Sequence, residues 1–428
     1  MSIEIKFPYE GDGFDCLLLP EGSSRPSSYF VKDVALPDSV YSLIEEALDN
    51  PIGTDRLSDL LEKRDSAAMK VALIIDDGSR PTPADEILPC ILDRLAAAGV
   101  RRENITIVIA LGTHVEMTGP EIEAKVGSRI YKEYRIENSH FNDESMMSLM
   151  GHTASGVPVY IDRTVAEADF RIGVGSIVPH GAVGWSGGGK IIYPGVAGKE
   201  TVKQFHFMHG LTRRNMKGVE ECSVRLEMEK WVEKVGLDFI VNSVLNQDGR
   251  VYRIVAGHYV KAQRRGVEYG REIYSFENEE KCDLVIALAY PHDDDFWLAA
   301  KGIYAGEQLT KDGGLLILLT PCKRGIGNHN LYIRRCGSSE TFDTLNRVLS
   351  GELEEPEDVV SLAPASMVHE LLKRIDIRLV TPTLDREEVE AGGFSWGNNI
   401  QKEVADFLAE NPDAKIGIIN HSDLTFAK

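Results

Sequence analysis

Residues 71–114 read VALIIDDGSRPTPADEILPCILDRLAAAGVRRENITIVIALGTH, and this stretch determines the fold class. An apolar run at Val71–Ile75 predicts a buried strand, and Asn104–Ala110 predicts a second strand. Between them, Ala84–Ala98 carries apolar residues at the spacing of an amphipathic helix. A strand, a crossover helix and a second strand predict a parallel sheet, whose functional loops lie at the carboxyl ends of its strands.

The alternation of strands and helices resumes in the last third of the chain, with strands expected at Asp283–Ala289 and Gly313–Thr320. We therefore predict an α/β protein of two α/β domains, each with a mainly parallel sheet, and an active site in the cleft between them. Residues 1–275 are expected to form a cofactor-binding domain, and residues 280–410 a C-terminal domain that closes the site. A last strand within residues 412–428 is expected to return to the first domain.

The composition indicates a protein with a small-molecule substrate. The 428 residues include 67 acidic and 47 basic ones, for a net charge of −20, which argues against nucleic acid or an anionic membrane as a partner. The six cysteines form no CxxC pair, as is usual in a reducing compartment. The first residues do not resemble a signal sequence, and no apolar run approaches the length of a membrane span. We expect a cytoplasmic protein.

Charged groups follow both strands of the opening stretch. Asp77 and Arg80 lie in a turn of Gly and Pro after the first strand, and His114 follows the second. An arginine at a strand end is suited to bidentate recognition of a carboxylate or phosphate. A histidine at the next strand end can accept or donate a proton. The alternatives are an ion pair confined to the turn and, for His114, a strand-end cap without a chemical role.

A second unusual stretch, residues 178–209, reads VPHGAVGWSGGGKIIYPGVAGKETVKQFHFMH. Its glycines leave backbone N–H groups unshielded, so the loop can fold around an anion such as a phosphate. Lys190 follows as a positive partner or a nucleophilic amine. The order is not that of a P-loop, because Ile191 stands where Ser or Thr is needed. The alternative is an ordinary Gly-rich connection to a helix that carries His206.

Together these motifs resemble the nickel-dependent lactate racemase family over most of the chain. The resemblance rests on DDGSRP with Asp77 and Arg80, GTH with His114, PHGAVGWSGGGK with His180 and Lys190, TVKQFH with His206, and WLAAKG with Lys301. His180 lies ten residues before Lys190, and His206 sixteen residues after it, in agreement with the family pattern.

The resemblance implies a nickel–pincer nucleotide as cofactor, which is a pyridine mononucleotide with two sulfur arms. Its covalent attachment is expected at Lys190, and His206 is expected to bind the nickel. The residues expected to contact the cofactor beside these two are Asp77, Ser186, Gly187, Gly188 and Gly189. Proteins that synthesise the cofactor are implied as partners.

The implied reaction is racemisation or epimerisation at the hydroxyl-bearing C2 of a small 2-hydroxy acid. Hydride transfer to and from the cofactor, through a 2-keto acid, avoids the carbanion that direct deprotonation would require. The resemblance makes His114 and His180 the acid–base pair. It also implies that Arg80 and Lys301 hold the carboxylate and polarise the oxygen of the intermediate.

The substrate pocket departs from the family pattern. Trp297 and Leu298 stand where the lactate enzymes have a Tyr-Gln pair, and Trp396 aligns with a family tryptophan near the pocket. We therefore expect a substrate other than lactate, either another short-chain 2-hydroxy acid or a sugar-derived one. His292–Asp295 and Lys323–Arg324 are candidates to face a longer chain or a second carboxylate; the alternative is that both are ordinary solvated loops.

Two alternative functions make different demands on the sequence. A nicotinamide-dependent hydroxy acid dehydrogenase would require a GxGxxG turn after an early strand, with an acidic residue further on, and the sequence contains neither. A non-catalytic carrier of nickel or nucleotide would use Lys190 and His206 without needing His114.

Overall fold

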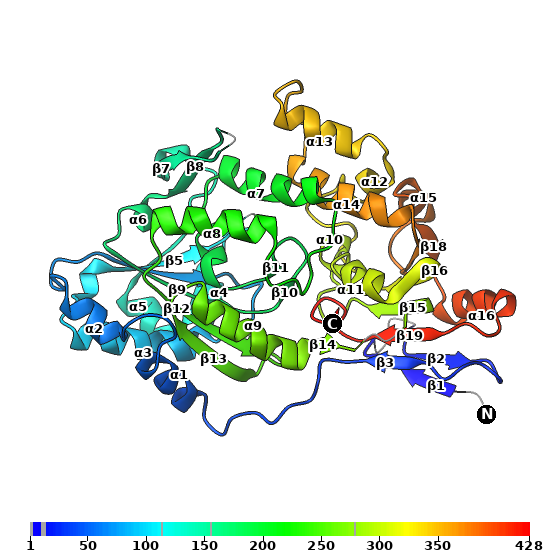
Figure 1. Cartoon of the computed structure of the whole chain (residues 1–428), viewed down its shortest axis with the longest axis horizontal. Helices are drawn as coiled ribbons and strands as arrows, with labels where there is room; N and C mark the ends of the chain where they lie inside the picture. The colour runs from blue at the N-terminus through cyan, green and yellow to red at the C-terminus, as the bar shows by residue number, and fades with distance from the viewer. Residues whose placement is uncertain (1–2, 10–13, 113, 155, 278–279) are drawn as a thin grey trace. The chain divides into compact units, whose positions relative to one another are not determined.

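The computed structural model describes residues 3–9, 14–112, 114–154, 156–277 and 280–428. The chain forms two compact units, and both are α/β (Figure 1). Unit 1 consists of Met1–Lys32, His206–Gly218 and Tyr274–Lys428, and unit 2 consists of Asp33–Phe205 and Val219–Ile273.

Unit 2 is built on a six-stranded sheet in the order β13-β12-β9-β4-β5-β6, in which only the β12–β13 pair is antiparallel. Its strands are β4 (Val71–Asp76), β5 (Ile105–Ala110), β6 (Arg135–Asn138), β9 (Phe170–Ser176), β12 (Phe239–Leu245) and β13 (Val251–Gly257). In β4, at the centre, every residue is buried, as expected for a strand that is covered on both faces. The predicted strands at the two ends of the opening stretch are confirmed.

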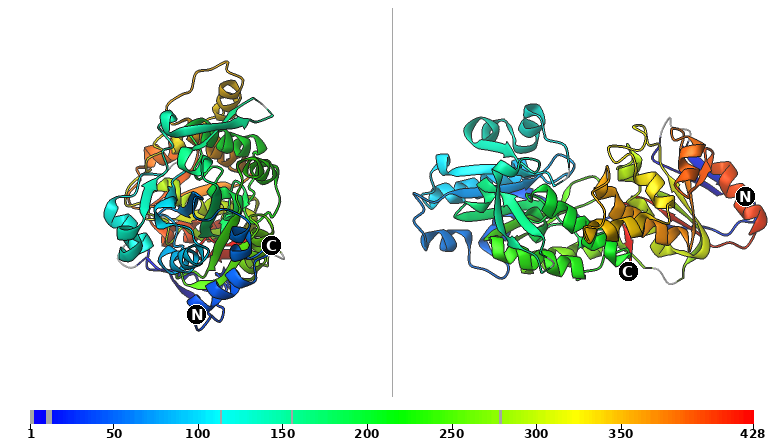
Figure 2. Two further views of the ribbon diagram at one scale, coloured as in Figure 1. Left: turned by 90° about the vertical axis from the view of Figure 1, so that its left-hand side faces the viewer. Right: turned by 90° about the horizontal axis from the view of Figure 1, so that it is seen from above.

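Helices lie on both faces of this sheet (Figures 1 and 2). They are α1 (Val40–Asp49), α2 (Leu57–Glu62), α3 (Ala84–Ala97), α4 (Gly119–Val126), α5 (Ser128–Glu133), α6 (Arg163–Ala166), α8 (Ser223–Val235) and α9 (Lys261–Tyr274), with short 3-10 helices η1 (Arg102–Asn104), η2 (Glu144–Met146) and η3 (Gly188–Ile191). The helix α7 (Lys199–Thr212) begins in unit 2 and ends in unit 1. Val71, Leu73 and Ile75 share a core with the apolar sides of α1, α2 and α3. Because side chains alternate along a strand, Ala72 and Ile74 point to the opposite face.

Two small antiparallel sheets stand apart from the main sheet of unit 2. They are β7 (Met147–His152) with β8 (Pro158–Asp162), and β10 (Pro179–His180) with β11 (Gly184–Trp185). Residues Pro158–Asp162 thus form a strand of a separate hairpin and not of the main sheet.

Unit 1 contains a second six-stranded sheet, in the order β18-β17-β16-β15-β19-β3, and all its pairs are parallel. Its strands are β3 (Ser27–Tyr29), β15 (Cys282–Leu288), β16 (Thr310–Leu319), β17 (Asp376–Val380), β18 (Ser395–Gly397) and β19 (Ile416–Ile419). Two further pairs complete the unit, namely β1 (Ile3–Lys6) with β2 (Cys16–Leu19), and β14 (Ser275–Phe276) with β20 (Phe426–Ala427).

The two faces of this second sheet are covered differently. Its helices are α10 (Phe296–Ala299), α11 (Gly302–Leu309), α12 (Tyr332–Gly337), α13 (Thr341–Leu349), α14 (Leu362–Leu372), α15 (Arg386–Ala391) and α16 (Ile400–Glu410), with the 3-10 helix η4 (Val359–Ser361). On one face, Val285 and Leu318 pack with α11, α12 and α14. On the other face, Leu284 and Ile317 pack against α16 and the β1–β2 hairpin, including Leu17.

The observed units differ from the predicted domain boundaries in three respects, one of which is that His206–Gly218 belongs to unit 1. The first 32 residues belong with the C-terminal unit, because β3 pairs with β19. The last strands also stay in that unit, since β19 pairs with β15 and β20 with β14, so the strand predicted within residues 412–428 does not return to the first domain. The N-terminal and C-terminal segments, blue and red, lie side by side (Figures 1 and 2).

Among the helices of the described chain, none combines the length and the apolar character needed to cross a membrane.

The packing of the β1–β2 hairpin yields a matched test. Leu17 is 0% exposed in the core of unit 1, whereas the neighbouring side chain of Leu18 is 47% exposed. We expect Leu17→Ala to reduce the free energy of unfolding of unit 1 by about 2–5 kcal/mol, because it leaves a cavity. Leu18→Ala should stay within about 0.5 kcal/mol of the parent. Urea unfolding of both variants measures the difference, and equal effects would contradict this packing.

Candidate active site

The carboxyl end of β4 carries a buried carboxylate that holds a histidine from the end of β5. Asp77 Oδ2 lies 2.5 Å from His114 Nδ1, and its Oδ1 accepts hydrogen bonds from the N–H and the hydroxyl of Ser79, at 3.1 and 2.6 Å. The side chain of Asp77 is 6% exposed and that of His114 is 39% exposed. An ionised carboxylate can only accept, so Nδ1 carries the proton and the neutral ring has a lone pair on Nε2. Thr113, in the same motif, lies outside the described residues.

The charge state of Asp77 supports this assignment. Burial acts to raise its pKa, but the hydrogen bond with His114, the hydrogen bonds with Ser79 and the charge of Arg80 together lower the pKa to about 2. Asp77 is therefore ionised at neutral pH, and it fixes the tautomer and the orientation of the His114 ring.

A lysine from α4 braces the turn that contains Arg80. Lys125 Nζ lies 2.9 Å from Asp76 Oδ1 and donates to the carbonyl oxygen of Arg80 at 2.7 Å. Asp76 Oδ2 accepts from the Thr82 hydroxyl at 2.5 Å, so both ends of the turn are anchored. The guanidinium of Arg80 forms no hydrogen bond or ion pair with any residue that the structure describes, and it is available to an anionic ligand.

His180 is the last residue of β10, and its Nδ1 accepts a hydrogen bond, whereas Nδ1 of His114 donates one. Nδ1 of His180 accepts from the backbone N–H of Ala182 at 3.1 Å. A backbone N–H can only donate, so Nδ1 is unprotonated and the neutral ring carries its proton on Nε2. His114 thus presents a proton acceptor at Nε2, and His180 presents a donor.

The loop from Ser186 to Lys190 is held in place by hydrogen bonds to neighbouring strands. The Ser186 hydroxyl donates to the Ser176 carbonyl oxygen at 2.7 Å, and the Gly188 N–H donates to Asn242 Oδ1 at 2.8 Å. A Cβ at Gly188 would lie 2.7 Å from the Tyr259 carbonyl oxygen, at a φ of +61° that also favours glycine.

The sequence predicts that the loop's backbone N–H groups are open to an anion, but three of them donate to other protein atoms. The N–H groups of Ser186, Gly188 and Lys190 donate to Val178 O, Asn242 Oδ1 and Gly187 O, respectively. A Cβ at Gly187 would lie 2.6 Å from Ile177 Cγ1, and one at Gly189 would lie 2.9 Å from Val232 Cγ2. Close packing therefore accounts for the glycines.

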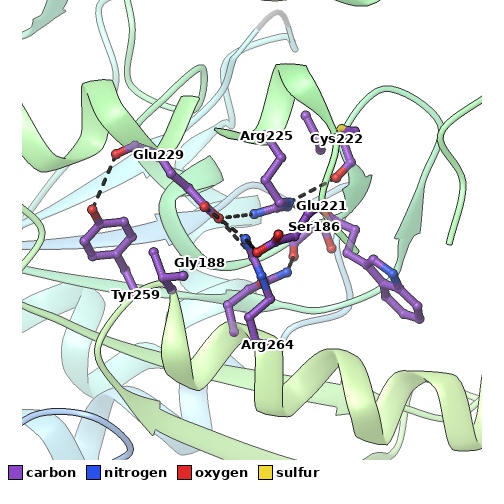
Figure 3. Close-up of polar contacts among 12 residues, drawn as sticks. Ser186, Gly188, Glu221, Cys222, Arg225, Glu229, Tyr259 and Arg264 are labelled. Atoms are coloured by element: carbon purple, nitrogen blue, oxygen red, sulfur yellow. Dashed lines mark hydrogen bonds and ion pairs between the residues drawn. The ribbon is translucent and has the colours of Figure 1, made fainter. Parts of the chain in front are cut away.

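A buried ionic network supports the same loop (Figure 3). Arg225, whose side chain is 0% exposed, donates to the carbonyl oxygens of Val183, at 3.0 Å, and Trp185. Glu229 Oε1 lies 3.1 Å from Arg225 and 2.9 Å from Arg264, so one carboxylate is shared by two guanidinium groups. A buried charge is tolerated only when it is paired and hydrogen-bonded in this way.

Two aromatic residues of unit 2, which lie close in sequence to Lys190 and His206, contact each other. Lys190 lies in η3 and His206 in α7, and both are half-buried, so each remains partly accessible. The Tyr193 and Phe205 rings meet edge to face, with centroids 5.8 Å apart. This contact joins the segment just after Lys190 to the residue before His206. A primary amine and an imidazole in this setting suit a group that is attached to lysine and binds nickel through nitrogen.

The remaining predicted residues lie in unit 1. Lys301 is the N-cap residue of α11, a few residues after Trp297 and Leu298 of α10. The Trp297 ring lies 4.0 Å from that of His329, measured between centroids, and both Trp297 and Leu298 are half-buried. Trp396 lies in β18, where its indole N–H donates to the Leu384 carbonyl oxygen at 3.0 Å.

Trp396 borders a surface hollow of about 500 Å³. Its described lining consists of Arg378, Arg386, Glu390, Phe394, Ser395, Trp396, Asn398, Lys402 and Glu403. No other predicted site residue is in that set.

Comparison with known proteins decides the family. Residues 23–218 match the lactate racemase N-terminal domain, and residues 277–422 match the lactate racemase C-terminal domain. The chain belongs to the lactate racemase family. A lactate racemase from Thermoanaerobacterium thermosaccharolyticum is 30% identical over 387 residues, 88% of each chain, and one from Lactiplantibacillus plantarum is 31% identical over 294 residues, 68% of each.

Solved structures agree with this assignment. The lactate racemase apoprotein from T. thermosaccharolyticum superposes with a TM-score of 0.85 at 28% identity, covering 100% of both chains. A Thermotoga maritima protein with a TM-score of 0.69 at 22% identity, covering 92% of this chain and 100% of its own, shares the fold. Membership of the lactate racemase family places the chain among the isomerases, in the racemase class, and enzymes of this family are in general nickel-dependent.

For this member of the lactate racemase family, sequence analysis missed three charged residues. Lys125 braces the Arg80 turn, but on the sequence it is one of several charges on a short helix. Lys217 is 3% exposed and donates to the Ser422 carbonyl oxygen at 2.6 Å, and its sequence context contains no signal for burial. Asp423 follows the strand that was predicted near the C-terminus, so the rule of functional strand ends could have identified it.

The Asp77–His114 pair predicts a tautomer switch. In Asp77→Asn, the side-chain amide can donate to Nδ1, and the neutral His114 ring would then carry its proton on Nε2. We expect the nitrogen NMR shifts of His114 to exchange their pattern. Ser79→Ala, which keeps the carboxylate, should leave the pattern unchanged. An unchanged pattern in Asp77→Asn would show that Asp77 does not set the tautomer.

The buried Lys217 should make the free energy of unfolding depend on pH. Burial lowers its pKa to about 7, although Asp423 acts to raise it. An unfolded lysine titrates near 10.4, so between about pH 7 and 10 the unfolded chain binds a proton that the folded chain lacks. The contribution of Lys217 to the free energy of unfolding therefore rises with pH between about pH 7 and 10.

We expect Lys217→Met to flatten the rise in urea midpoint between pH 7 and pH 9. Lys32→Met, at an exposed lysine, should keep the parent profile. Parallel profiles for the parent and Lys217→Met would contradict the lowered pKa.

Proposed function

We propose that the protein is a racemase or epimerase that inverts C2 of a 2-hydroxy acid other than lactate, with a nickel–pincer nucleotide attached at Lys190. The observation that carries the proposal is the arrangement at β9, β4 and β5, which are neighbours in one parallel sheet. Their carboxyl ends lead to His180, to Asp77 with Arg80, and to His114, respectively. Parallel neighbours end at one edge, so an anion binder and two histidines share that edge.

Each of these residues has a defined task in the proposed reaction. Arg80 binds the substrate carboxylate through its guanidinium, and Lys301 is proposed to assist by polarising the oxygen at C2. His114 accepts the hydroxyl proton at Nε2, while Asp77 holds Nδ1 and stabilises the resulting imidazolium. His180 faces the reaction with Nε2 as a donor. For the opposite stereoisomer, His180 must act as the base, and the hydrogen bond from Ala182 must then break.

The proposed cofactor is held by Lys190 through its amine and by His206 through its imidazole, with the loop from Ser186 to Gly189 against it. When bound, it would supply an acceptor and donor for the C2 hydrogen as hydride, which a side chain cannot provide. The loop's own packing holds the Lys190 backbone in place, which favours a single attachment geometry.

The expectation of a substrate other than lactate rests on α10. Trp297 and Leu298 present an indole and an alkyl side chain, and the indole contacts the His329 ring in a tilted arrangement. Neither can accept a hydrogen bond through a side-chain oxygen, so a substrate contact of that kind is absent at these two positions.

Cofactor loading tests the proposal directly. In protein produced together with the cofactor's biosynthetic enzymes, we expect a nucleotide-sized mass adduct and near-stoichiometric nickel. Lys190→Ala should abolish the adduct, and His206→Ala should lower the nickel content. Lys199→Ala, at an exposed lysine nearby, is the matched control and should load fully. Absence of both adduct and nickel beside a loaded lactate racemase would refute the proposal.

Catalysis is tested separately on the loaded protein. His114→Ala should retain the adduct and nickel but lower the rate of C2 inversion by about 10²–10⁴-fold, the usual range for loss of a general base. A fully loaded parent that inverts no 2-hydroxy acid would instead support a non-catalytic carrier.

A further inference from the structure

Unit 1 contains a second aspartate–histidine pair, built in the same way as Asp77–His114. His292 follows β15 and Asp423 follows β19, and these strands are neighbours in the parallel sheet. Nδ1 of His292 contacts Asp423 Oδ2. The side chain of Asp423 is 7% exposed, whereas that of His292 is 37% exposed. A buried carboxylate thus orients an accessible imidazole at the carboxyl edge of the sheet.

The surroundings of Asp423 keep it ionised. Its burial acts to raise the pKa, but His292, Lys217 and His421 outweigh burial, and the pKa is lowered. Asp423 Oδ1 is buried and has no hydrogen-bond partner among the described residues. An ionised Asp423 can only accept from His292, so Nδ1 carries a proton and, in the neutral ring, Nε2 has the lone pair.

This pair is connected to the lysine that is proposed to contact the substrate. The loop after β15 leads from His292 to Asp295, whose Oδ1 caps α10 by accepting from the Leu298 N–H at 2.9 Å. Lys301 begins the next helix. The charges of Lys301 and Asp423 both act on the buried Lys217, so the three groups are electrostatic neighbours within unit 1.

We propose that His292 is a specificity-determining residue that accepts, at Nε2, a hydrogen bond from a hydroxyl on C3 or beyond of a polyhydroxylated 2-hydroxy acid, with Asp423 as its positioning residue. The inference rests on the proposed function and adds the substrate class. The lone pair on Nε2 can accept from a hydroxyl, which is the neutral donor that a polyhydroxylated acid carries at C3 and beyond. Lactate has only a methyl group at C3 and offers this acceptor no donor.

The test uses the loaded enzyme and three probe acids, glycerate, gluconate and lactate, with malate as a dicarboxylate. We expect the parent to show a higher kcat/KM for at least one polyhydroxylated acid than for lactate. His292→Leu should lower that kcat/KM by about 10–100-fold, because the substrate hydroxyl loses an oriented hydrogen-bond acceptor. The kcat/KM for lactate, which lacks that hydroxyl, should change less than about 3-fold.

Two further variants separate contact from folding. His292→Gln provides a carbonyl oxygen as acceptor and should restore part of the lost selectivity. Asp423→Asn should reverse the tautomer of His292 and lose selectivity while lactate inversion persists. His152→Leu, at an exposed histidine of β7, is the matched control and should retain both activities.

The other outcomes are equally decisive. Equal losses on lactate and polyhydroxylated acids, or no loss in His292→Leu, would overturn the role of His292 but leave the proposed function standing. A preference for malate that His292→Leu removes would replace the hydroxyl with a second carboxylate. A loaded parent that inverts neither glycerate nor gluconate would overturn this inference, whereas the proposed function is decided separately by the loading of Lys190 and His206.

Discussion

The guanidinium of Arg225 is the constraint on which the rest of the candidate site depends. It lies fully buried where the chain between His180 and Lys190 turns its carbonyl groups inward, and it satisfies those of Val183 and Trp185. Its charge is balanced by Glu229, which Arg264 also contacts. Removal of Glu229 would leave the buried guanidinium of Arg225 without its carboxylate partner, at a cost of several kcal/mol. The network therefore gives a glycine-rich segment, which would otherwise be flexible, one conformation.

Each of the two units orients an accessible histidine with a buried carboxylate. In each, a carboxylate at one strand end is buried while a histidine at the neighbouring strand end stays accessible. Burial alone would favour a protonated acid, and the hydrogen-bonded histidine reverses that preference. The result is an imidazole whose outer nitrogen is chemically defined before any ligand arrives. Parallel sheets favour such pairs because adjacent strands end at one edge.

The sequence predicted the features that depend on local pattern. Apolar runs located β4, β5, β15 and β16, and a strand end singled out His114, because both rules need only neighbouring residues. His180 was singled out by the family motif. The role of Gly188 could not be predicted in the same way, since the carbonyl that approaches it belongs to Tyr259, far along the chain. Lys125 and Lys217 were missed for the same reason, because their partners are distant in sequence. The short β3 carries no pattern of its own and becomes a strand only by pairing with β19.

The pairing of β3 with β19 also bears on how the protein is made. On the ribosome, Ser27 emerges long before its partner Gly417. Unit 2 is encoded between these two segments and has all its strands synthesised before β15 appears. The segment that contains β3 therefore stays unpaired, with apolar residues such as Leu17 still uncovered, until β19 has been synthesised. Contacts of such long sequence separation form slowly, so the nascent chain passes through an interval in which one unit is folded and the other exposes an unpaired sheet edge.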